Sequence, residues 1–485
     1  MRQALTVIHA LGLMLVLFSA AYLMPLVVSL IYADGTLIDF ALAMVMTAAA
    51  GCLMWMFTRR YKGEISIRHG YLLVVAMWTA MPAVATLPLL MVIDGLTFTD
   101  AYFETMSGIT TTGATVLTGL DNLPPAINLW RNELSWLGGM GIIVLAVAVL
   151  PLLGVGGRQL YKAETPGPMK DSALTPRITE TARNLWLAYF AITLACIMSL
   201  KLVGMSWLDA VCHAFATMSL GGFSTHDASI GYFNSPAIEL VLIVFMLLAA
   251  VNFSTHFLAW KAKSLKVYLK DAEAKATIIL ILGSCIGVSA FLWWQGTYPS
   301  FWTTLRHVSF NLVSVATDCG FVSVDFNQWP VFAPMWMLFL SCVSVSSGST
   351  GGGIKMIRTI ILFKQAGREF IKLLHPAAVN PMIIGGQVVP NNIVFSVLGF
   401  IFLYFMTVVT LTFSLMASGL DFISSFSAII ACINNAGPGL GQVGPAGNYA
   451  GLTSFQTWVC TVAMLAGRLE IFTLVIIFTP RFWQR

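Results

Sequence analysis

Charged side chains are scarce in this chain of 485 residues: Asp, Glu, Lys and Arg make up 10% of it, whereas apolar residues make up 58%. A soluble globular protein carries about 25% charged residues, so the composition excludes that class, and the mean hydropathy of +0.83 agrees. Apolar runs of about 20 residues, enough to cross a bilayer, recur from end to end. We therefore expect a polytopic α-helical membrane protein, and the first run, from Leu11 to Ile31, reads as a retained helix and not as a signal peptide.

The chain also lacks the residue patterns of a metal centre or an enzyme. Its eight cysteines are scattered, mostly within apolar runs, without a Cys-x-x-Cys pair, so no disulfide or zinc site is expected. It has no intramembrane Ser/His set, no paired Asp and no His-Glu-x-x-His motif, and His213, His256 and His307 lack ligand spacing. The sequence predicts neither an enzyme nor a covalently bound cofactor, and it gives no sign of nucleic-acid binding.

A polar stretch, Thr110–Gly113, stands between two long apolar segments. It follows a short helix expected over Phe98–Ile109 and is too poor in helix propensity to extend that helix. Backbone that returns in this way is a re-entrant loop, which is tolerated at membrane depth only where it is buried or lines a water-filled cavity. The same design recurs three times, so that the four loops are centred on Gly113, Gly222, Gly320 and Gly437.

The four loops divide the chain into tandem units with a period of roughly 100–120 residues. Each unit is predicted as a spanning helix, a short pore helix, a loop and a second spanning helix. The expected first helices are Tyr71–Ile93, Asn184–Val203, Ala276–Gln295 and Ile393–Ala417; the pore helices are Phe98–Ile109, Trp207–Met218, Phe301–Ala316 and Phe422–Ile433; the second helices are Leu129–Leu153, Ala237–Trp260, a run from Val331 that resumes at Ile354–Leu374, and Phe455–Phe478.

The predicted fold is thus an all-α polytopic membrane protein with four helix–pore loop–helix repeats around a pseudo-fourfold ion pathway. An extra helix pair, Thr6–Tyr32 and Leu37–Phe57, precedes the repeats. The expected divisions are residues 1–68 for this pair, 69–165, 166–265 and 266–375 for repeats 1 to 3, and 376–485 for repeat 4.

Four glycine-centred loops around one axis would form a cation filter. Rings of backbone carbonyls replace the hydration shell of a monovalent cation, glycine permits the positive φ that aligns them, and the negative ends of the pore-helix dipoles add to the attraction. The carbonyls are expected from the residues before each glycine: Thr110, Thr111 and Thr112; Ser219, Leu220 and Gly221; Thr317, Asp318 and Cys319; Asn434, Asn435 and Ala436. Tight helix packing explains one such patch, but four favour a filter.

Positive charge predicts the topology. All but five of the 26 Lys and Arg residues lie near the N-terminus, in the inter-repeat segments or in the tail, which places both termini in the cytoplasm. The outer side is then acidic, and its carboxylates either concentrate cations or cap short helices. The clustered Lys261, Lys263, Lys266 and Lys270 would dock a cytoplasmic partner or anchor to anionic lipid.

Two further features mark repeat 3 and repeat 4. The glycine loop, Gly348–Gly353, interrupts a spanning run, which implies a cavity beside it or a packing kink. It fails as a phosphate-binding loop, because the lysine is Lys355 and not residue 354, and Met356 follows it. Arg468 lies midway along the last predicted helix and must face the protein interior, because a charge facing lipid is costly. It would act there as an electrostatic barrier or gate latch, or it would be a structural residue bonded to pore-loop carbonyls. Glu470 falls on a different helix face.

These motifs together identify a resemblance. The fourfold array, the single filter glycine per repeat, Gly348-Ser-Thr-Gly-Gly-Gly-Ile-Lys355 and Ala466-Gly-Arg-Leu-Glu470 resemble the Trk/Ktr/HKT superfamily of K⁺ transporters. The extra helix pair makes the chain most similar to its TrkH branch, the bacterial Trk-type potassium-uptake membrane subunits.

The resemblance implies K⁺ translocation, a homodimer in the bacterial inner membrane, and a cytoplasmic TrkA-like ring that alone carries the nucleotide. It implies that a gate below the filter is formed by Gly348, Ser349, Thr350, Gly351, Gly352, Gly353, Lys355 and Arg468. Each filter keeps only one glycine, so weaker discrimination of K⁺ from Rb⁺ and Na⁺ is expected.

Two modes of transport remain open from the sequence. Channel-like flow is the first. The alternative is a K⁺/H⁺ or K⁺/Na⁺ symporter, which inverted repeats and paired intramembrane carboxylates would favour; here the repeats run parallel, and only Glu470 is expected deep in a spanning helix.

Overall fold

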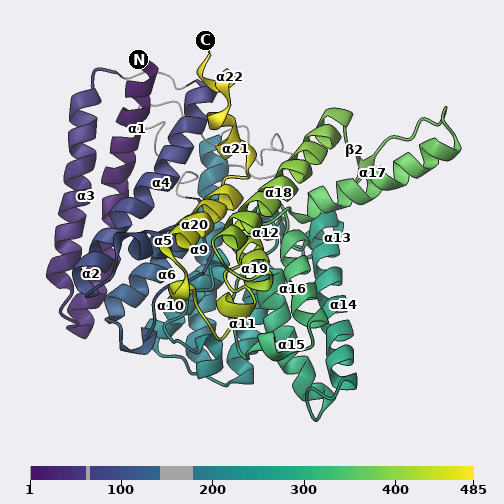
Figure 1. The fold of residues 1–485 in the computed structure, drawn as a ribbon, viewed down its shortest axis with the longest axis horizontal. Coiled ribbons are helices and arrows are strands. Elements are labelled where there is room, and N and C mark those ends of the chain that lie inside the picture. Colours follow the sequence, from purple (N-terminus) through teal and green to yellow (C-terminus); the bar gives the residue numbers. More distant parts are fainter. Residues whose placement is uncertain (1, 62–65, 142–177, 485) are drawn as a thin grey trace.

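The computed structural model describes residues 2–61, 66–141 and 178–484, and these residues form an all-α bundle with one two-stranded hairpin (Figure 1). Within the described ranges, six helices are long and apolar enough to span a membrane, and the number of spans rises to eight if each of two bent helix pairs counts as one. The prediction of an all-α polytopic membrane protein is confirmed. Both chain ends lie at the same side of the bundle (Figure 1).

The N-terminal helix pair packs against repeat 1. It consists of α1 (Arg2–Phe18), η1 (Ser19–Tyr22), α2 (Leu23–Tyr32) and α3 (Leu37–Thr58). The Tyr22 ring stacks on Trp130 of repeat 1 at a centroid distance of 4.5 Å, and Phe18 and Phe40 contact the same indole. This aromatic cluster fixes the extra pair to the first pore unit.

Each repeat begins with a first helix and a short pore helix. The first helices are α4 (Ile67–Val92), α9 (Ile178–Leu202), α14 (Ala272–Trp294) and α18 (Asn391–Ala417); the pore helices are α5 (Phe98–Ile109), α10 (Trp207–Ser219), α15 (Phe301–Ala316) and α19 (Phe422–Ile433). Short 3-10 turns follow the pore loops: η2 (Leu120–Asn122), η4 (Ser229–Tyr232), η5 (Phe326–Gln328), η6 (Gly441–Val443) and η7 (Tyr449–Gly451).

The second helices differ from the prediction, because those of repeats 2, 3 and 4 are broken within the described residues. They are α6 (Pro125–Gly139); α11 (Pro236–Ala249) with α12 (Phe253–Ala262); α16 (Phe332–Val343) with α17 (Met356–Leu374); and α20 (Ser454–Arg468) with α21 (Phe472–Val475) and η8 (Ile476–Phe478). A break was expected only in repeat 3. The continuous helices predicted over Ala237–Trp260 and Phe455–Phe478 are wrong, since the chain bends there by 94° and 108°.

The helix predicted over Leu129–Leu153 also begins and ends earlier. It starts at Pro125, whose ring is pre-set for the first turn of a helix, and it ends at Gly139 before Gly141, which has a positive φ of 72°. Residues 142–177 lie outside the described part of the chain. The rest of the helix predicted up to Leu153 and the repeat boundary predicted at residue 165 therefore lie outside it too. The boundary expected at residue 68, between the N-terminal helix pair and repeat 1, falls at the second residue of α4.

The remaining elements connect repeats or end the chain. α13 (Lys266–Lys270) joins repeats 2 and 3, β1 (Ile383–Ile384) pairs antiparallel with β2 (Gln387–Val388) beyond the projecting helix α17, and α22 (Pro480–Trp483) ends the described chain (Figure 1).

Burial follows the pattern of a membrane protein. Large apolar side chains such as Phe57, Leu202 and Trp294 are highly exposed on the outside. By contrast, threonines, serines and asparagines next to the pore-loop glycines are buried at the centre. The polar groups therefore converge where the four repeats meet.

Candidate functional site

The four pore helices start and end in the same way. Each begins at an N-cap side chain that accepts a hydrogen bond from a backbone N–H of the first turn, as Thr97 accepts from Asp100. The corresponding caps are Ser206, Ser300 and Asp421. Such caps satisfy donors that the helix leaves free. Each helix then ends directly at its pore loop, so its partially negative end faces the loop.

The backbone of the four pore loops has one common conformation. The central glycines have φ values of 77° at Gly113, 62° at Gly222, 85° at Gly320 and 84° at Gly437. Two residues earlier the φ is positive again, at Thr111 (57°), Leu220 (55°), Asp318 (64°) and Asn435 (58°). Non-glycine residues in this region cost about 1–3 kcal/mol each. The same strained backbone therefore recurs in four loops whose side chains have little in common.

The four loops close into a ring. A Cβ atom placed on Gly437 would come within 2.7 Å of the carbonyl oxygen of Thr112. At the other three glycines the equivalent atom would come closer still to a carbonyl of the next repeat: Gly113 to Gly221, Gly222 to Cys319, and Gly320 to Ala436. Each contact joins a glycine to the residue before the next pore-loop glycine, and repeat 4 closes on repeat 1. No side chain fits at these positions.

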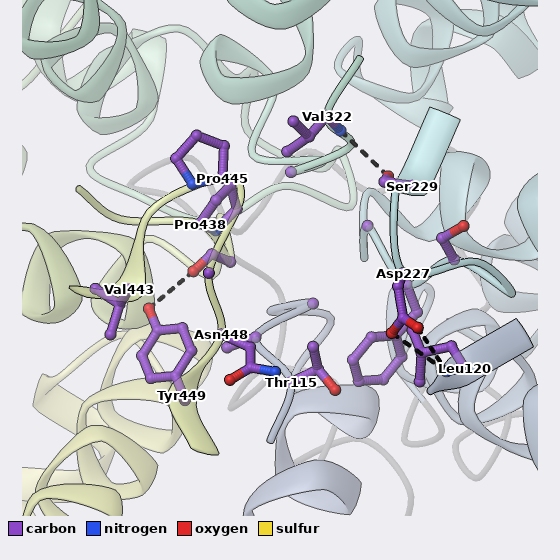
Figure 2. Close-up of a pocket in the computed structure, with 18 of the residues that line it drawn as sticks. Thr115, Leu120, Asp227, Ser229, Val322, Pro438, Val443, Pro445, Asn448 and Tyr449 are labelled. Carbon is purple, nitrogen blue, oxygen red and sulfur yellow. Dashed lines mark hydrogen bonds between the residues drawn. The ribbon is translucent and has the colours of Figure 1, made fainter. Parts of the chain in front are cut away.

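A hollow of about 550 Å³, including its open mouth, lies on one side of this ring. All four glycines line it, together with the segments that follow them. Figure 2 shows Thr115, Asp227, Val322 and Pro438 around its open centre, one from each repeat. The loops thus end in a common vestibule.

Buried polar side chains of the pore helices hold the segments that leave the ring. Glu104, His213 and Asn311 each lie nine residues before a pore-loop glycine. Glu104 accepts from the Val116 N–H at 3.0 Å, and Asn311 accepts from the Ser323 N–H at 3.1 Å. His213 Nε2 lies 2.9 Å from Ser224 Oγ. In repeat 4, Ser427 accepts from Leu440 N–H at 2.8 Å.

Sequence reasoning missed Glu104 and Asn311 as supports of the loops and treated His213 only as a structural residue. Their constant spacing from the glycine was the available signal.

The glycine loop packs against the other side of the pore loops. Thr350 Oγ1 donates to the carbonyl of Met218 at 3.0 Å, in the pore helix of repeat 2. A Cβ on Gly351 would meet the Thr317 carbonyl at 3.1 Å, and one on Gly352 would clash with the Asn434 carbonyl. The loop therefore touches the ends of three pore helices, and Lys355 Nζ donates to the carbonyl of Gly351.

Arg468 connects the glycine loop to repeat 1. Its Nη1 donates to the carbonyl of Thr350 at 2.9 Å and to Thr111 Oγ1 at 3.2 Å, and its Nη2 donates to the carbonyls of Gly138 and Gly139, the latter at 3.1 Å. The predicted mid-helix position is wrong: Arg468 is the last residue of α20.

The base of the glycine loop is tied to α14. Oε1 of Glu273 accepts from the N–H groups of Ser347 at 2.9 Å and Ile357 at 3.0 Å, which lie just before and after the loop. One carboxylate oxygen therefore holds both ends of the loop together.

Buried carboxylates are more numerous than the sequence suggested. Glu470, expected deep in a spanning helix, lies at the bend after α20 and pairs with Arg358 at 2.7 Å. Glu133, within α6, is 5% exposed, and its Oε2 has no hydrogen-bond partner among the described residues. The expectation of a single deep carboxylate is therefore wrong.

No group of three or more His, Cys, Asp or Glu side chains that could hold a metal ion occurs in the described ranges. The polar groups at the ring are mainly backbone carbonyls and hydroxyls, which suit a weakly held monovalent cation that passes through.

Comparison with known proteins agrees with this geometry. Residues 37–485 match the family model TrkH, described as a cation transport protein. The chain is 45% identical over 474 residues to the Trk system potassium uptake protein TrkH of Salmonella typhimurium, with 98% of each chain covered. It is 45% identical to the protein of that name from Halomonas elongata over 480 residues, with 99% of each chain covered.

A solved structure is also similar. The crystal structure of the potassium transporter TrkH from Vibrio parahaemolyticus matches with a TM-score of 0.90 and 42% identity, over 99% of this chain and 100% of that one. These matches confirm the predicted superfamily and the prediction of a transport protein that is not an enzyme. This chain belongs to the TrkH family of Trk-type potassium-uptake membrane proteins.

Proposed function

We propose that K⁺ crosses the membrane through the ring of four pore loops, as channel-like flow in a Trk-type uptake system. The filter consists of Gly113, Gly222, Gly320 and Gly437 with the three residues before each. The observation that carries this proposal is the cyclic contact between each glycine and the carbonyl before the next one. Carbonyls arranged in this way replace water around K⁺ without adding net charge.

The filter is short, because only one glycine stands in each loop. We therefore expect Rb⁺ to permeate almost as K⁺ does, and Na⁺ less well. The ion is the substrate, held only at the filter carbonyls, and the transport step needs no covalently bound cofactor.

The glycine loop and Arg468 form the gate. Contacts with Met218, Thr317 and Asn434 support a position across the pathway directly beneath the filter. The charge of Arg468 at this level repels cations, and its hydrogen bond to Thr350 holds the loop in place. Withdrawal of α17 would pull the loop aside, because Lys355 joins the loop to the start of that helix.

Charge and family membership support the proposed orientation, assembly and location. The positive-inside rule places both termini in the cytoplasm of a bacterial inner membrane, and the termini share one side of the bundle (Figure 1). A homodimer and a TrkA-like cytoplasmic ring, which alone carries the nucleotide, complete the proposed system.

The basic segment around α13 is the proposed docking point for that ring. Lys261, Lys263, Lys266 and Lys270 are all exposed, and α13 leads directly to α14, whose Glu273 holds the glycine loop. Reversal of all four charges should weaken co-purification of the ring. An unchanged yield of complex, with weaker binding to anionic vesicles only, would assign the segment to lipid anchoring instead.

Coupled K⁺/H⁺ or K⁺/Na⁺ symport is the second candidate, and the buried carboxyl of Glu133 favours it, because proton-coupled transporters use such groups. Purified protein in planar bilayers and proteoliposomes separates the two modes. Single-channel current steps, with no K⁺ accumulation driven by a proton or Na⁺ gradient at zero voltage, would support channel-like flow. Gradient-driven accumulation without current steps would support symport.

A further inference from the structure

Glu104 and Arg131 form an ion pair in the wall of the vestibule. Arg131 Nε lies 2.8 Å from Glu104 Oε1, and both side chains are 1% exposed. Glu104 belongs to the pore helix α5, and Arg131 belongs to α6. A buried ion pair is often no more stabilising than apolar residues of similar size. Its presence at this place therefore calls for a role other than stability.

Glu104 holds the segment that leaves the filter in repeat 1. Its two carboxylate oxygens accept from Thr115 Oγ1 at 2.9 and 3.0 Å, and Oε2 accepts from the Val116 N–H at 3.0 Å. The contact continues into repeat 4: the Thr115 carbonyl accepts from the Tyr449 N–H at 2.9 Å, and the Tyr449 hydroxyl donates to the Gly437 carbonyl at 2.8 Å. Glu104 is thus linked to two of the four loops.

Arg131 extends the same network into repeat 2. Its Nη1 donates to the carbonyl of Ser224 at 3.1 Å, two residues after the filter glycine Gly222, and its Nη2 donates to Thr115 Oγ1 at 3.3 Å. The guanidinium also lies 4.4 Å from the centre of the Phe223 ring. A planar fork makes these contacts at once, which the single ammonium of a lysine cannot do.

The pair also sets the charge at the entrance. Arg131 lines the vestibule, where an uncompensated positive charge would repel an approaching cation. Glu104 compensates it at hydrogen-bond distance. The equivalent supports in repeats 2 and 3, His213 and Asn311, stand without such a guanidinium partner in the described residues.

We propose that the Glu104–Arg131 pair is a positioning element of the filter. The pair fixes the segments that follow Gly113 and Gly222, and it keeps the vestibule free of excess positive charge. The proposal rests on the proposed filter. It assigns two separable effects to the pair: geometry, which governs discrimination of K⁺ from Na⁺, and charge, which governs the K⁺ concentration for half-maximal flux.

Three variants separate these effects in proteoliposomes. Glu104→Gln leaves the arginine uncompensated and should raise the half-saturating K⁺ concentration about tenfold, because an uncompensated positive charge beside the pathway lowers the local concentration of cations. Glu104→Gln/Arg131→Gln removes both charges and should return half-saturation toward the parent while K⁺/Na⁺ discrimination stays reduced. Arg131→Lys keeps the charge but not the fork, so it should reduce discrimination with little change in half-saturation.

A general folding defect would instead lower the maximal flux and the yield of every variant, without separate effects on discrimination and on half-saturation. The matched control is Glu239→Gln, which breaks the Glu239–Arg306 pair at 2.7 Å between α11 and α15; it should leave discrimination unchanged. If Glu104→Gln fails to fold, Arg131→Lys still tests the geometry.

A filter variant, Gly113→Ala, belongs in the same assay. In one outcome, Gly113→Ala loses discrimination of K⁺ from Na⁺ while Glu104→Gln and Arg131→Lys match the parent in discrimination and in half-saturating K⁺ concentration. That result would mean that the ion-pair proposal is wrong and that the proposed filter is supported. If Gly113→Ala also keeps the parental discrimination, the proposed filter itself is wrong.

Discussion

Arg468 Nη1 lies 2.9 Å from the carbonyl oxygen of Thr350, although 118 residues separate the two positions. The same guanidinium reaches Thr111 in the first pore loop. One side chain of repeat 4 therefore joins the glycine loop of repeat 3 to the pore loop of repeat 1, and this connection supports the proposal that Arg468 holds the pathway closed.

Replacement of Arg468 by alanine should raise the basal K⁺ flux of purified protein in proteoliposomes about tenfold. The reason is that a hydrogen bond from a charged donor is worth about 1.5–3 kcal/mol, and the variant also removes the repulsive charge. Arg468→Lys keeps the charge and should have a smaller effect. A flux below that of the parent at equal protein content would exclude a latch.

Gly352→Ala tests the position of the glycine loop. The added methyl group would clash with the Asn434 carbonyl, so we expect the loop to shift away from the pore and the basal flux to rise severalfold, with ion preference unchanged. The control is Gly367→Ala in α17, where no atom lies within 4 Å of the added Cβ. Reduced flux in Gly352→Ala, with the control at the parental level, would mean that the loop does not block the pathway.

His226 provides a pH-dependent contact between repeats 1 and 2. Its Nδ1 lies 2.5 Å from Asp121 Oδ1, its Nε2 lies 3.4 Å from Asp209 Oδ1, and its ring stacks on Tyr232 at 3.6 Å and faces His213 at 6.5 Å. Burial lowers the pKa of His226, but the two carboxylates raise it more, so its net shift is upward.

A raised histidine pKa stabilises the fold below the unfolded value of about 6.5, and this contribution is lost as pH rises through the folded pKa. His226→Gln should therefore lower the thermal unfolding temperature in detergent more at pH 6 than at pH 8. His375→Gln, at an exposed position, is the control and should show no such difference. An equal loss for His226→Gln at both pH values would exclude a charged His226.

The sequence predicted the pore helices well but not the breaks in the second helices. The bounds of α5, α15 and α19 agree with prediction, because Thr97, Ser300 and Asp421 cap them and polar loops end them. The bend before α12 falls inside the predicted helix Ala237–Trp260, at Asn252, whose side chain caps α12 by accepting from the Ser254 N–H. Asn252, Ser254, Thr255 and His256 interrupt the apolar residues there, so the sequence carried a helix-start signal that the prediction did not use.

Tertiary contacts also hold this bend. The Ala250 carbonyl accepts from Ser346 N–H and the Phe253 N–H donates to the Gly348 carbonyl, so the partner that bends the helix lies about a hundred residues away. The Glu104–Arg131 pair likewise has no spacing signal in the sequence, because it forms only when α5 and α6 pack together.

The proposal that the four glycines form the filter is tested most directly by a comparison of two glycines with the same positive φ. Gly113 and Gly95 both have a φ of 77°, but only Gly113 abuts a carbonyl of the next repeat, whereas nothing lies within 4 Å of a Cβ on Gly95. The reversal potential under opposed K⁺ and Na⁺ gradients should shift toward zero in Gly113→Ala and stay at the parental value in Gly95→Ala. A parental reversal potential in Gly113→Ala, with measurable current, would contradict the filter.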